Sequence, residues 1–428
     1  MAQYKAPRGT HDIYGQMALA LEELDKISRT VFRKHNFKEI KTPMFEDVSL
    51  FTRSIGEATD IVEKEMYVFE DRKGRKLALR PEGTASLVRA YIEHRLDMEE
   101  PIGKFFYCGD MFRYERPQAG RYREFLQMGA EYLGNPNPNA DVEIILLAKE
   151  ILSALNINDV VIHINSLGCA NCRPIFRQKL VDYFSSIQDL CEDCKRRLEK
   201  NPLRLLDCKI DSQKFQNVPT MQECLCDDCK NHFDQVQSLL KSVGCEYVVD
   251  DKLVRGLDYY TRTVFEVRSN AVGSQDAICA GGRYDNLVKE LGGQQIPSVG
   301  FALGSERVLM AAQNTGFFDK LPKNELVFIA LADNELFNEA FKFANNLILN
   351  RDNIRQKLEL QDNIIVEGPF INKSLKSQFK LADKLGASKT ILFGKTEFDN
   401  GKILVKDMKT QQQELYTYLS PNVCLGGI

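Results

Sequence analysis

The stretch 104–133 combines charged, amide and aromatic side chains in a pattern that could bind a nucleotide together with a small cation. Its composition predicts two strands, Lys104 to Glu115 and Glu124 to Leu133, joined by a loop. Successive side chains of a strand point to opposite faces, so one parity of each strand can line a common surface. The side chains that share a parity are Arg113 and Glu115 on the first strand, and Phe125, Gln127, Gly129 and Glu131 on the second.

The chemistry of such a surface follows from its groups. Guanidinium groups match phosphate oxygens and neutralise their charge, an aromatic ring can stack on a base, and carboxylates can hold an ammonium group. The loop between the strands adds Arg116, Arg121 and Arg123. An ordinary exposed sheet with scattered charges is the alternative that this stretch leaves open.

Cysteines are concentrated in one segment, because eight of the 12 in the chain lie between Cys169 and Cys229. Two Cys-x-x-Cys pairs brought together form a tetrahedral thiolate site suited to a structural Zn²⁺. Free thiols packed as small hydrophobic side chains are the competing interpretation. We expect one Zn²⁺ bound by Cys191, Cys194, Cys226 and Cys229, with Cys169 and Cys172 as alternative ligands.

Length and composition predict several folded units of ordinary globular character. The chain has 428 residues, of which 43% are hydrophobic and 27% charged, so we expect two or three units rather than one core. The formal net charge of -3 implies that any contact with nucleic acid is local. Residues 1–14 contain no apolar run, so we expect neither a signal peptide nor a membrane span, and a cytoplasmic location.

Hydrophobic periodicity predicts the elements that position these residues. We expect helices over 19–36, 141–155 and 284–291, strands over 160–165 and 261–267, and a tight turn at Gly281 and Gly282. A linker is expected over 321–324. Beyond it, strands over 326–331, 390–393 and 402–405 alternate with helices over 336–349 and 375–385, which predicts a small α/β domain with a mainly parallel sheet.

Three segments resemble the sequence motifs of class II aminoacyl-tRNA synthetases. IKTPMFEDVSLFTRSIG (40–56) resembles motif 1, MFRYERPQAGRYREF (111–125) motif 2, and GFALGSERVLM (300–310) motif 3. Two more segments, LVRGLDYYTRTVFE (253–266) and CAGGRYDNLV (279–288), are similar to signatures of the histidyl-tRNA synthetases. The order and spacing of the segments carry more weight than any one of them.

The resemblance implies an α+β fold. A class II catalytic domain on a mainly antiparallel sheet would carry a small cysteine-rich helical insertion and be followed by a C-terminal α/β anticodon-binding domain. The catalytic domain would comprise residues 1–168 and 246–320, the insertion 169–245, and the anticodon-binding domain 325–428.

The resemblance also implies roles for individual residues. Arg255 and Arg113 would act at the α-phosphate of ATP, with Arg255 standing where related enzymes use a metal ion. The residues expected to bind ATP are Arg113, Glu115, Arg121, Phe125 and Arg307. Those expected to bind histidine are Glu82, Thr84, Gln127, Glu131, Tyr260 and Tyr284.

The expected partners are ATP with Mg²⁺, L-histidine, tRNA(His) and a second copy of the chain. Mg²⁺ would enter as the chelate of ATP, because this ion binds mainly through phosphates and water. Arg116 and Gln118 match the loop that reads the tRNA acceptor end, and motif 1 forms a dimer interface in this class. Lys373, Lys376, Lys380 and Lys384 follow helical spacing and could face RNA or only solvent.

Two other functions compete with tRNA ligation. A synthetase-like regulatory subunit that senses histidine would be expected to lose the terminal domain and the motif arginines, yet both are present. A zinc-dependent RNA-binding module built around the cysteines would leave the synthetase motifs without a role.

Overall fold

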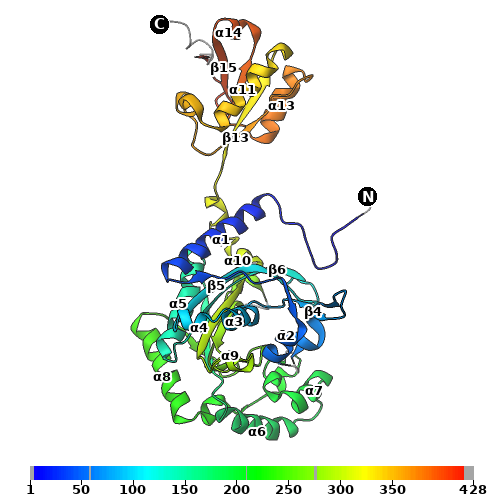
Figure 1. Cartoon of the computed structure of the whole chain (residues 1–428), viewed down its shortest axis with the longest axis vertical. Coiled ribbons are helices and arrows are strands. Elements are labelled where there is room, and N and C mark those ends of the chain that lie inside the picture. The colour runs from blue at the N-terminus through cyan, green and yellow to red at the C-terminus, as the bar shows by residue number, and fades with distance from the viewer. Residues whose placement is uncertain (1–3, 57–58, 209, 274–276, 419–428) are drawn as a thin grey trace. The chain divides into compact units, whose positions relative to one another are not determined.

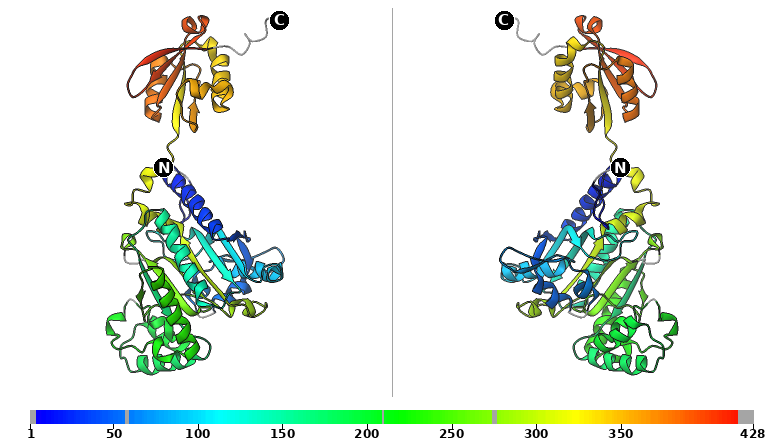
Figure 2. Two further views of the ribbon diagram at one scale, coloured as in Figure 1. Left: turned by 90° about the vertical axis from the view of Figure 1, so that its left-hand side faces the viewer. Right: turned by 90° about the vertical axis from the view of Figure 1, so that its right-hand side faces the viewer.

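The structure is a computed structural model that describes residues 4–56, 59–208, 210–273 and 277–418. The chain forms two compact units, 1–321 and 322–428, and each is described by itself. In Figures 1 and 2 the first unit begins in blue and passes through green, and the second ends in red.

An eight-stranded sheet forms the centre of the first unit. Its strands are β1 (Lys38–Glu39), β5 (Gly103–Phe112), β6 (Glu124–Leu133), β7 (Val161–Ser166), β8 (Val248–Val249), β9 (Thr261–Arg268), β10 (Ala277–Arg283) and β11 (Ser298–Gly304). They lie in the order β1-β5-β6-β11-β10-β9-β7-β8, and among the described residues only β1/β5 and β7/β8 are parallel pairs. The expectation of a mainly antiparallel sheet is confirmed.

Strand register gives the two faces of β6 different surroundings. Met128, Ala130 and Tyr132 point into the main hydrophobic core. The side chains of the other parity include Gln127 and Glu131, whose residues pair with Gly304 and Gly300 of the neighbouring strand β11. The sheet therefore separates an apolar face from a face that carries polar groups, as strand alternation predicts.

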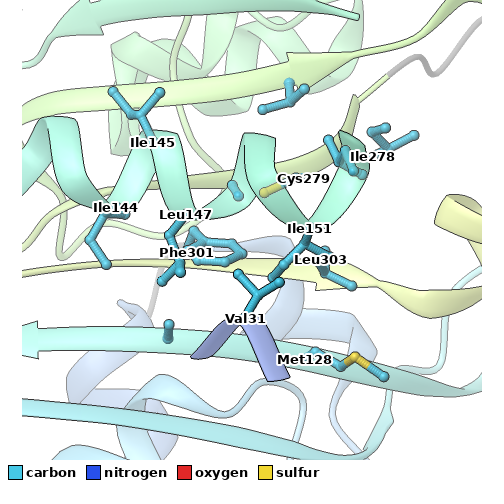
Figure 3. Packing of buried hydrophobic residues seen from close by; sticks show 14 of the residues in the cluster. Val31, Met128, Ile144, Ile145, Leu147, Ile151, Ile278, Cys279, Phe301 and Leu303 are labelled. Carbon is cyan, nitrogen blue, oxygen red and sulfur yellow. The ribbon is translucent and has the colours of Figure 1, made fainter. Parts of the chain in front are cut away.

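The main core lies between the apolar face and a layer of helices. These helices are α1 (Gln16–Lys34), α5 (Pro138–Ala154), α8 (Asp227–Ser242) and α10 (Ser305–Ala312). Helix α5 is apolar around most of its circumference and begins with a proline in its first turn, a position where the missing N–H costs nothing. Figure 3 shows Leu147 and Ile151 of α5 beside Phe301 and Leu303 of β11.

Smaller elements cover the opposite face. A three-stranded sheet has the order β2-β4-β3 and consists of β2 (Phe45–Asp47), β3 (Val68–Glu70) and β4 (Lys76–Leu79). The helices are α2 (Val48–Ile55), α3 (Thr84–Glu93), α4 (Leu96–Glu99) and α9 (Leu287–Glu290). Asp47 caps α2 by accepting a hydrogen bond of 2.9 Å from the Ser49 amide, which satisfies an amide that the helix leaves without a partner.

The cysteine-rich segment is helical, as expected. It contains α6 (Cys172–Ser185) and α7 (Glu192–Lys200), followed by short 3₁₀ turns and then α8. Phe176, Leu180 and Phe184 of α6 share a hydrophobic cluster with Leu87 and Tyr107. Because the cysteine-rich segment shares this cluster with α3 and β5, a change in the segment can reach the face of the sheet that carries polar groups.

The second unit is built on a five-stranded sheet in the order β13-β12-β14-β15-β16. Its elements are β12 (Glu325–Leu331), β13 (Ile364–Glu367), β14 (Lys389–Phe393), β15 (Lys402–Asp407), β16 (Gln413–Thr417), α11 (Phe337–Ile348), α12 (Ile354–Lys357), α13 (Leu375–Leu385) and α14 (Lys395–Asp399). The expectation of a mainly parallel sheet is wrong, because β14/β15 and β15/β16 are antiparallel. Their connections are too short for the crossover that a parallel pair requires.

The expected turn at Gly281 and Gly282 is also wrong, because both glycines lie within β10. A Cβ on Gly281 would lie 2.2 Å from the carbonyl oxygen of Gly300 on the neighbouring strand. The glycine is therefore needed for close strand packing, which the sequence pattern does not distinguish from a turn.

None of the helices in the described part of the chain combines the length and the apolar character that crossing a membrane requires.

A buried ion pair joins β10 to α5. The side chains of Arg283 and Asp141 are both 0% exposed and form an ion pair, and His232 Nε2 lies 3.3 Å from Asp141 Oδ2. Burial alone would raise the pKa of Asp141. The Arg283 guanidinium and His232 lower this pKa by more, so that it falls to about 2. Removing one partner of such a pair leaves a buried charge without compensation.

Replacing Asp141 with Asn should lower the free energy of unfolding by about 3–5 kcal/mol at pH 7. The folded-state pKa lies below the unfolded value of about 3.9, so this stabilisation is present above that pH and is lost as pH falls towards about 2. Urea denaturation across this range should show the wild-type advantage shrinking with acid. Exposed Asp159, replaced with Asn, is the control; an advantage that stays constant down to pH 2 would contradict the assignment.

Candidate active site

A pocket of about 720 Å³ opens on the face of the sheet that carries polar groups. All the residues expected to bind ATP line it, namely Arg113, Glu115, Arg121, Phe125 and Arg307, as do Arg255 and Gln127. The insertion forms another wall with Cys191, Arg197, Arg204, Asp207 and Cys208. The sheet thus gathers side chains that are far apart in the sequence around one cavity.

The hairpin positions two of the arginines. Arg113 follows the end of β5, where its Nε donates a hydrogen bond of 2.9 Å to the carbonyl of Pro81. Its guanidinium carbon lies 5.4 Å from the ring centre of Phe125. Arg121, in the loop, forms an ion pair of 3.3 Å with Glu115. The guanidinium groups and the ring share one surface, which suits a phosphate chain attached to a planar base.

Arg255 is held on the opposite side by β9. Its Nη1 forms an ion pair with Glu266, whose other oxygen accepts from Arg268 Nε at 3.0 Å. The Arg255 guanidinium carbon also lies 5.8 Å from the ring centre of Tyr260. Glu266 fixes the direction of Arg255, and Tyr260 connects this arginine to the residues expected to bind histidine.

A compact set of hydrogen bonds surrounds Glu131. Thr84 Oγ1 donates to Glu131 Oε1 at 2.6 Å, and the hydroxyl of Tyr284 donates to Oε2. A Cβ on Gly300, the residue opposite in β11, would lie 1.6 Å from Oε2. Only a glycine at this position leaves room for the carboxyl group.

Gln127 lies where this set meets the pocket. The hydroxyl of Tyr107 and the amide of Gly83 donate to Gln127 Oε1 at 3.1 and 3.3 Å. Those donors fix the oxygen of the side chain, which leaves the amide NH₂ of Gln127 as a donor for a ligand.

Glu82 organises the start of α3 beside Glu131. Its carboxyl group accepts hydrogen bonds of 2.7 and 2.8 Å from the amides of Thr84 and Ala85. Burial raises the pKa of Glu82. The carboxyl group fixes the helix start and therefore the orientation of the Thr84 hydroxyl towards Glu131.

Burial also alters the charge state of Glu131. Burial raises its pKa to about 8, although hydrogen bonds from Thr84 and Tyr284 act in the opposite direction. An uncharged carboxyl group at neutral pH becomes ionised when a cationic group binds against it. The set therefore offers a buried acceptor for an ammonium or imidazolium group.

Some residues of the site were not predicted from the sequence. Tyr107 has the same strand parity as Arg113, so alternation could have identified it. Glu266 lies within a signature segment but received no role there. Arg204 and Asp207 of the insertion follow no pattern that points to a pocket, and only the fold brings them beside Arg255.

The cysteines form two separate groups instead of one. Cys169, Cys172, Cys226 and Cys229 have their sulfur atoms within 4.8 Å of one another. Cys191 and Cys194 form a second group with Cys208 and Asp211. The expected set of Cys191, Cys194, Cys226 and Cys229 is therefore wrong. The fold brings the Cys-x-x-Cys pair at the start of α6 together with the pair at the start of α8, while the pair at the start of α7 lies beside Cys208 and Asp211.

The residues expected to contact RNA are exposed. Arg116 and Gln118 lie in the hairpin loop, where the Gln118 amide donates to the Arg121 carbonyl at 3.1 Å. In the second unit the four lysines Lys373, Lys376, Lys380 and Lys384 are exposed, and three of them lie on α13.

Comparison with known proteins decides between the families compatible with this site. The sequence profile described as histidyl-tRNA synthetase matches residues 9–172 and 195–308. The chain belongs to the histidyl-tRNA synthetase family. Between its two matched stretches the profile leaves 173–194 unmatched, and these residues lie within the segment 169–245 that was expected to be an insertion.

Individual relatives of the histidyl-tRNA synthetase family match along almost the whole chain. The histidine–tRNA ligase of Endomicrobium trichonymphae is 62% identical over 96% of this chain and 98% of its own length. That of Halothermothrix orenii is 47% identical over 96% of both. The apo histidyl-tRNA synthetase of S. aureus has a TM-score of 0.79 at 33% identity, covering 97% of each chain.

A regulatory relative supports only the fold. The ATP phosphoribosyltransferase regulatory subunit/histidyl-tRNA synthetase from Bacillus halodurans has a TM-score of 0.61 at 22% identity and covers 86% of this chain. The much higher identity of the full-length ligases favours a synthetase over the regulatory alternative.

Replacing Glu131 with Gln should weaken histidine binding by about 10- to 100-fold, because a charge-assisted contact is lost. Calorimetric titration with L-histidine measures this loss. Exposed Glu99, replaced with Gln, serves as the control. Unchanged affinity would remove Glu131 from the histidine site.

The same variant should change the pH dependence of stability. The folded-state pKa of about 8 lies above the unfolded value of about 4.3, so Glu131 costs the wild type stability as pH rises through this window. The variant lacks this titration and should lose less stability over that range. Parallel unfolding curves for the two proteins between pH 5 and about 8 would contradict the raised pKa.

Proposed function

We propose that the chain is a histidine–tRNA ligase that converts ATP, L-histidine and tRNA(His) into histidyl-tRNA(His), AMP and diphosphate through an enzyme-bound histidyl-adenylate. The observation that carries this proposal is the junction of two environments at Gln127. On one side lies the arginine-lined pocket, and on the other the buried carboxyl group of Glu131.

ATP would occupy the pocket with its base against Phe125. Arg113 would hold the α-phosphate, while Arg121 and Arg307 would hold the outer phosphates, and Glu115 would help to position the base. Arg121 pairs with Glu115 at 3.3 Å, so nucleotide binding would exchange a carboxylate partner for phosphate oxygens. Mg²⁺ would accompany ATP as its chelate.

Histidine would bind beside the Glu131 set. The ionised Glu131 would accept from a cationic group of the amino acid, with Thr84 and Tyr284 holding the carboxylate in place. Gln127, Tyr260 and Glu82 complete the binding site. This arrangement directs the histidine carboxylate towards the arginine-lined side of the pocket.

Adenylate formation would follow from this placement. An oxygen of the histidine carboxylate attacks the α-phosphorus, the bond to the bridging oxygen breaks, and diphosphate leaves with the electron pair. Negative charge grows on the non-bridging oxygens in the transition state, where Arg113 and Arg255 stabilise it. The carboxylate is already ionised near pH 7, so this step needs no general base.

Transfer to tRNA would use the adenylate as the activated acyl group. A hydroxyl of the terminal ribose attacks the carbonyl carbon, AMP leaves, and a phosphate oxygen of the adenylate is the candidate acceptor for the proton. The exposed Arg116 and Gln118 support contact with the acceptor end. The lysines of α13 support RNA contact in the second unit.

A homodimer accords with the surface of the motif 1 segment. Met44, Phe45, Val68 and Phe69 are between 42% and 52% exposed on the small three-stranded sheet and its approach. Phe45 and Phe69 share one face of this sheet, where their ring centres lie 6.1 Å apart, and exposed apolar surface of this kind is typical of an interface. A second copy of the chain would cover this surface, and the dimer would act in the cytoplasm. A monomeric mass in light scattering would oppose this part of the proposal.

The group Cys169, Cys172, Cys226 and Cys229 fits a structural Zn²⁺. Zn–S bonds of about 2.3 Å in a tetrahedron place sulfur atoms about 3.8 Å apart. Cys169 Sγ lies 3.6 Å from Cys172 Sγ and 3.9 Å from Cys226 Sγ. The amide of Cys226 donates to Cys172 Sγ at 3.2 Å. Zinc there would join the start of α6 to the start of α8.

Purified protein should catalyse histidine-dependent exchange between diphosphate and ATP, and should charge tRNA(His). The first assay tests activation and the second tests transfer. Folded protein that bound histidine but supported neither reaction would favour the regulatory alternative and oppose the proposed ligase.

Replacing Arg255 with Ala should lower the rate of exchange by about 10²- to 10³-fold, the usual effect of removing one group that stabilises transition-state charge. Histidine affinity should change little, since Arg255 contacts only the Tyr260 ring of that site. Arg255→Lys should recover part of the activity, and exposed Arg72→Ala should retain it. Equal losses in exchange and in histidine affinity would refute the assigned role.

Replacing Cys226 with Ser should remove one zinc equivalent per chain from protein purified under reducing conditions without added metal. Cys245, replaced with Ser, is a matched control because it is buried but belongs to neither cysteine group. Elemental analysis measures the metal. Zinc content unaffected by Cys226→Ser would rule out this ligand set.

A further inference from the structure

We propose that Cys191, Cys194, Cys208 and Asp211 form a second site for a thiophilic divalent cation of the Zn²⁺ class, and that this site braces the insertion wall of the catalytic pocket. The metal site stands on its own geometry, while its effect on catalysis rests on the proposed function.

The donor atoms have the geometry of a tetrahedral site. All four lie within 4.8 Å of one another. Cys191 Sγ and Cys208 Sγ are 3.9 Å apart, close to the edge of about 3.8 Å that Zn–S bonds of about 2.3 Å produce. Three thiolates and one carboxylate carry four negative charges, and a divalent cation bound among them reduces the net charge of the group to about −2. Carboxylate oxygen is an ordinary zinc ligand beside sulfur.

Backbone hydrogen bonds already orient the donors. The amide of Asp211 donates to Cys208 Sγ at 3.3 Å. The amide of Cys191 donates to Asp211 Oδ2 at 2.8 Å. Hydrogen bonds of this kind fix the orientation of metal ligands. A backbone amide also donates to sulfur in the other cysteine group, from Cys226 to Cys172.

The burial of Asp211 argues against a group of plain hydrophobic thiols. Its side chain is 1% exposed, and Lys214, at 3.0 Å, is itself 43% exposed. A buried carboxylate facing sulfur atoms is costly unless a cation compensates it. A metal ion coordinated by Asp211 and the three thiolates supplies that compensation from within the group.

The position of the group connects it to the pocket. Cys191 and Cys208 themselves line the cavity, together with Arg197, Arg204 and Asp207. Cys191 and Cys194 stand at the start of α7, whereas Cys208 and Asp211 follow the turn after that helix. A metal ion would therefore close the segment 191–211 into a loop and restrict it as a cross-link does.

The loop carries charges that meet the catalytic part. Arg197 Nη2 lies 3.2 Å from Asp60 Oδ2, and Arg204 Nη2 lies 3.5 Å from the same oxygen. Arg204 also pairs with Asp207 at 3.1 Å, on the wall shared with Arg255. Without the metal ion the wall would depend on polar contacts of this kind, which include Lys200 with Glu63 at 2.7 Å and Asn201 with Asp258 at 2.8 Å, so the position of the loop relative to ATP would be less well fixed.

Elemental analysis of the full-length protein, purified under reducing conditions and given Zn²⁺ as the only metal, tests the site. The wild type should hold two zinc equivalents per chain. Cys208→Ser and Cys226→Ser should each remove one, the double variant both, and Cys245→Ser neither. Asp211→Cys should keep the second equivalent, whereas Asp211→Asn should bind it more weakly. One equivalent in the wild type, unchanged by Cys208→Ser, would overturn the second site.

Two further measurements keep the result decisive. Mass spectrometry of the protein purified without reductant should find Cys191 and Cys208 as free thiols; a disulfide between them would overturn metal ligation. If Cys208→Ser fails to fold, as judged by circular dichroism, Asp211→Asn provides the metal count in its place. The metal count does not depend on activity, so a protein that holds two equivalents but charges no tRNA would refute only the proposed function.

Enzyme kinetics test whether the second metal site fixes the insertion wall of the pocket. In the exchange assay Cys208→Ser should lower kcat/KM for ATP by about 10-fold or more, because small displacements of binding groups are costly. The affinity for histidine, measured by calorimetry, should stay within about twofold, since the Glu131 set lies in the catalytic part. An unchanged kcat/KM for ATP after loss of the second zinc equivalent would overturn the proposal that this site fixes the pocket wall.

Discussion

The two-residue period of the central sheet is the constraint on which the other features depend. In β6 one parity packs Met128 and Ala130 against the helical layer, and the other presents Gln127 and Glu131 to the site. A slip of one residue would exchange these faces, burying the carboxyl group in the main core and exposing the apolar groups. Gly300 enforces the register, because only a residue without Cβ fits opposite Glu131.

Much of this arrangement could be predicted from the sequence. Strand alternation predicts that Arg113, Phe125 and Glu131 share one surface, and the motif segments predict an antiparallel sheet. Alternation succeeds here because one face of the sheet packs against the helical layer, whereas the other combines the polar groups of the site with buried apolar residues such as Tyr107 and Leu133. The strand over Gly281 and Gly282 was predicted as a turn, since glycines required for close strand approach look the same as turn glycines.

The cysteine groups show what local spacing cannot determine. Each Cys-x-x-Cys pair is visible in the sequence, but the choice of partner depends on how α6, α7 and α8 fold back on the catalytic part. The donor Asp211 carries no motif and is identified only by its position. The contribution of Arg204 and Asp207 to the pocket was missed for the same reason. Contacts between distant segments depend on the tertiary fold, which is not encoded in local periodicity.

The charge balance of the pocket has a consequence for how fast a nucleotide can arrive. Among its described lining residues, arginines are matched in number by aspartates and glutamates, and pairs such as Arg121 with Glu115 are already formed. The cavity therefore projects little net field into the solvent, and an approaching polyanion gains little acceleration from long-range attraction. Selection between nucleotides must occur after contact, during the exchange of partners, so differences in affinity should arise in dissociation rates more than in encounter rates.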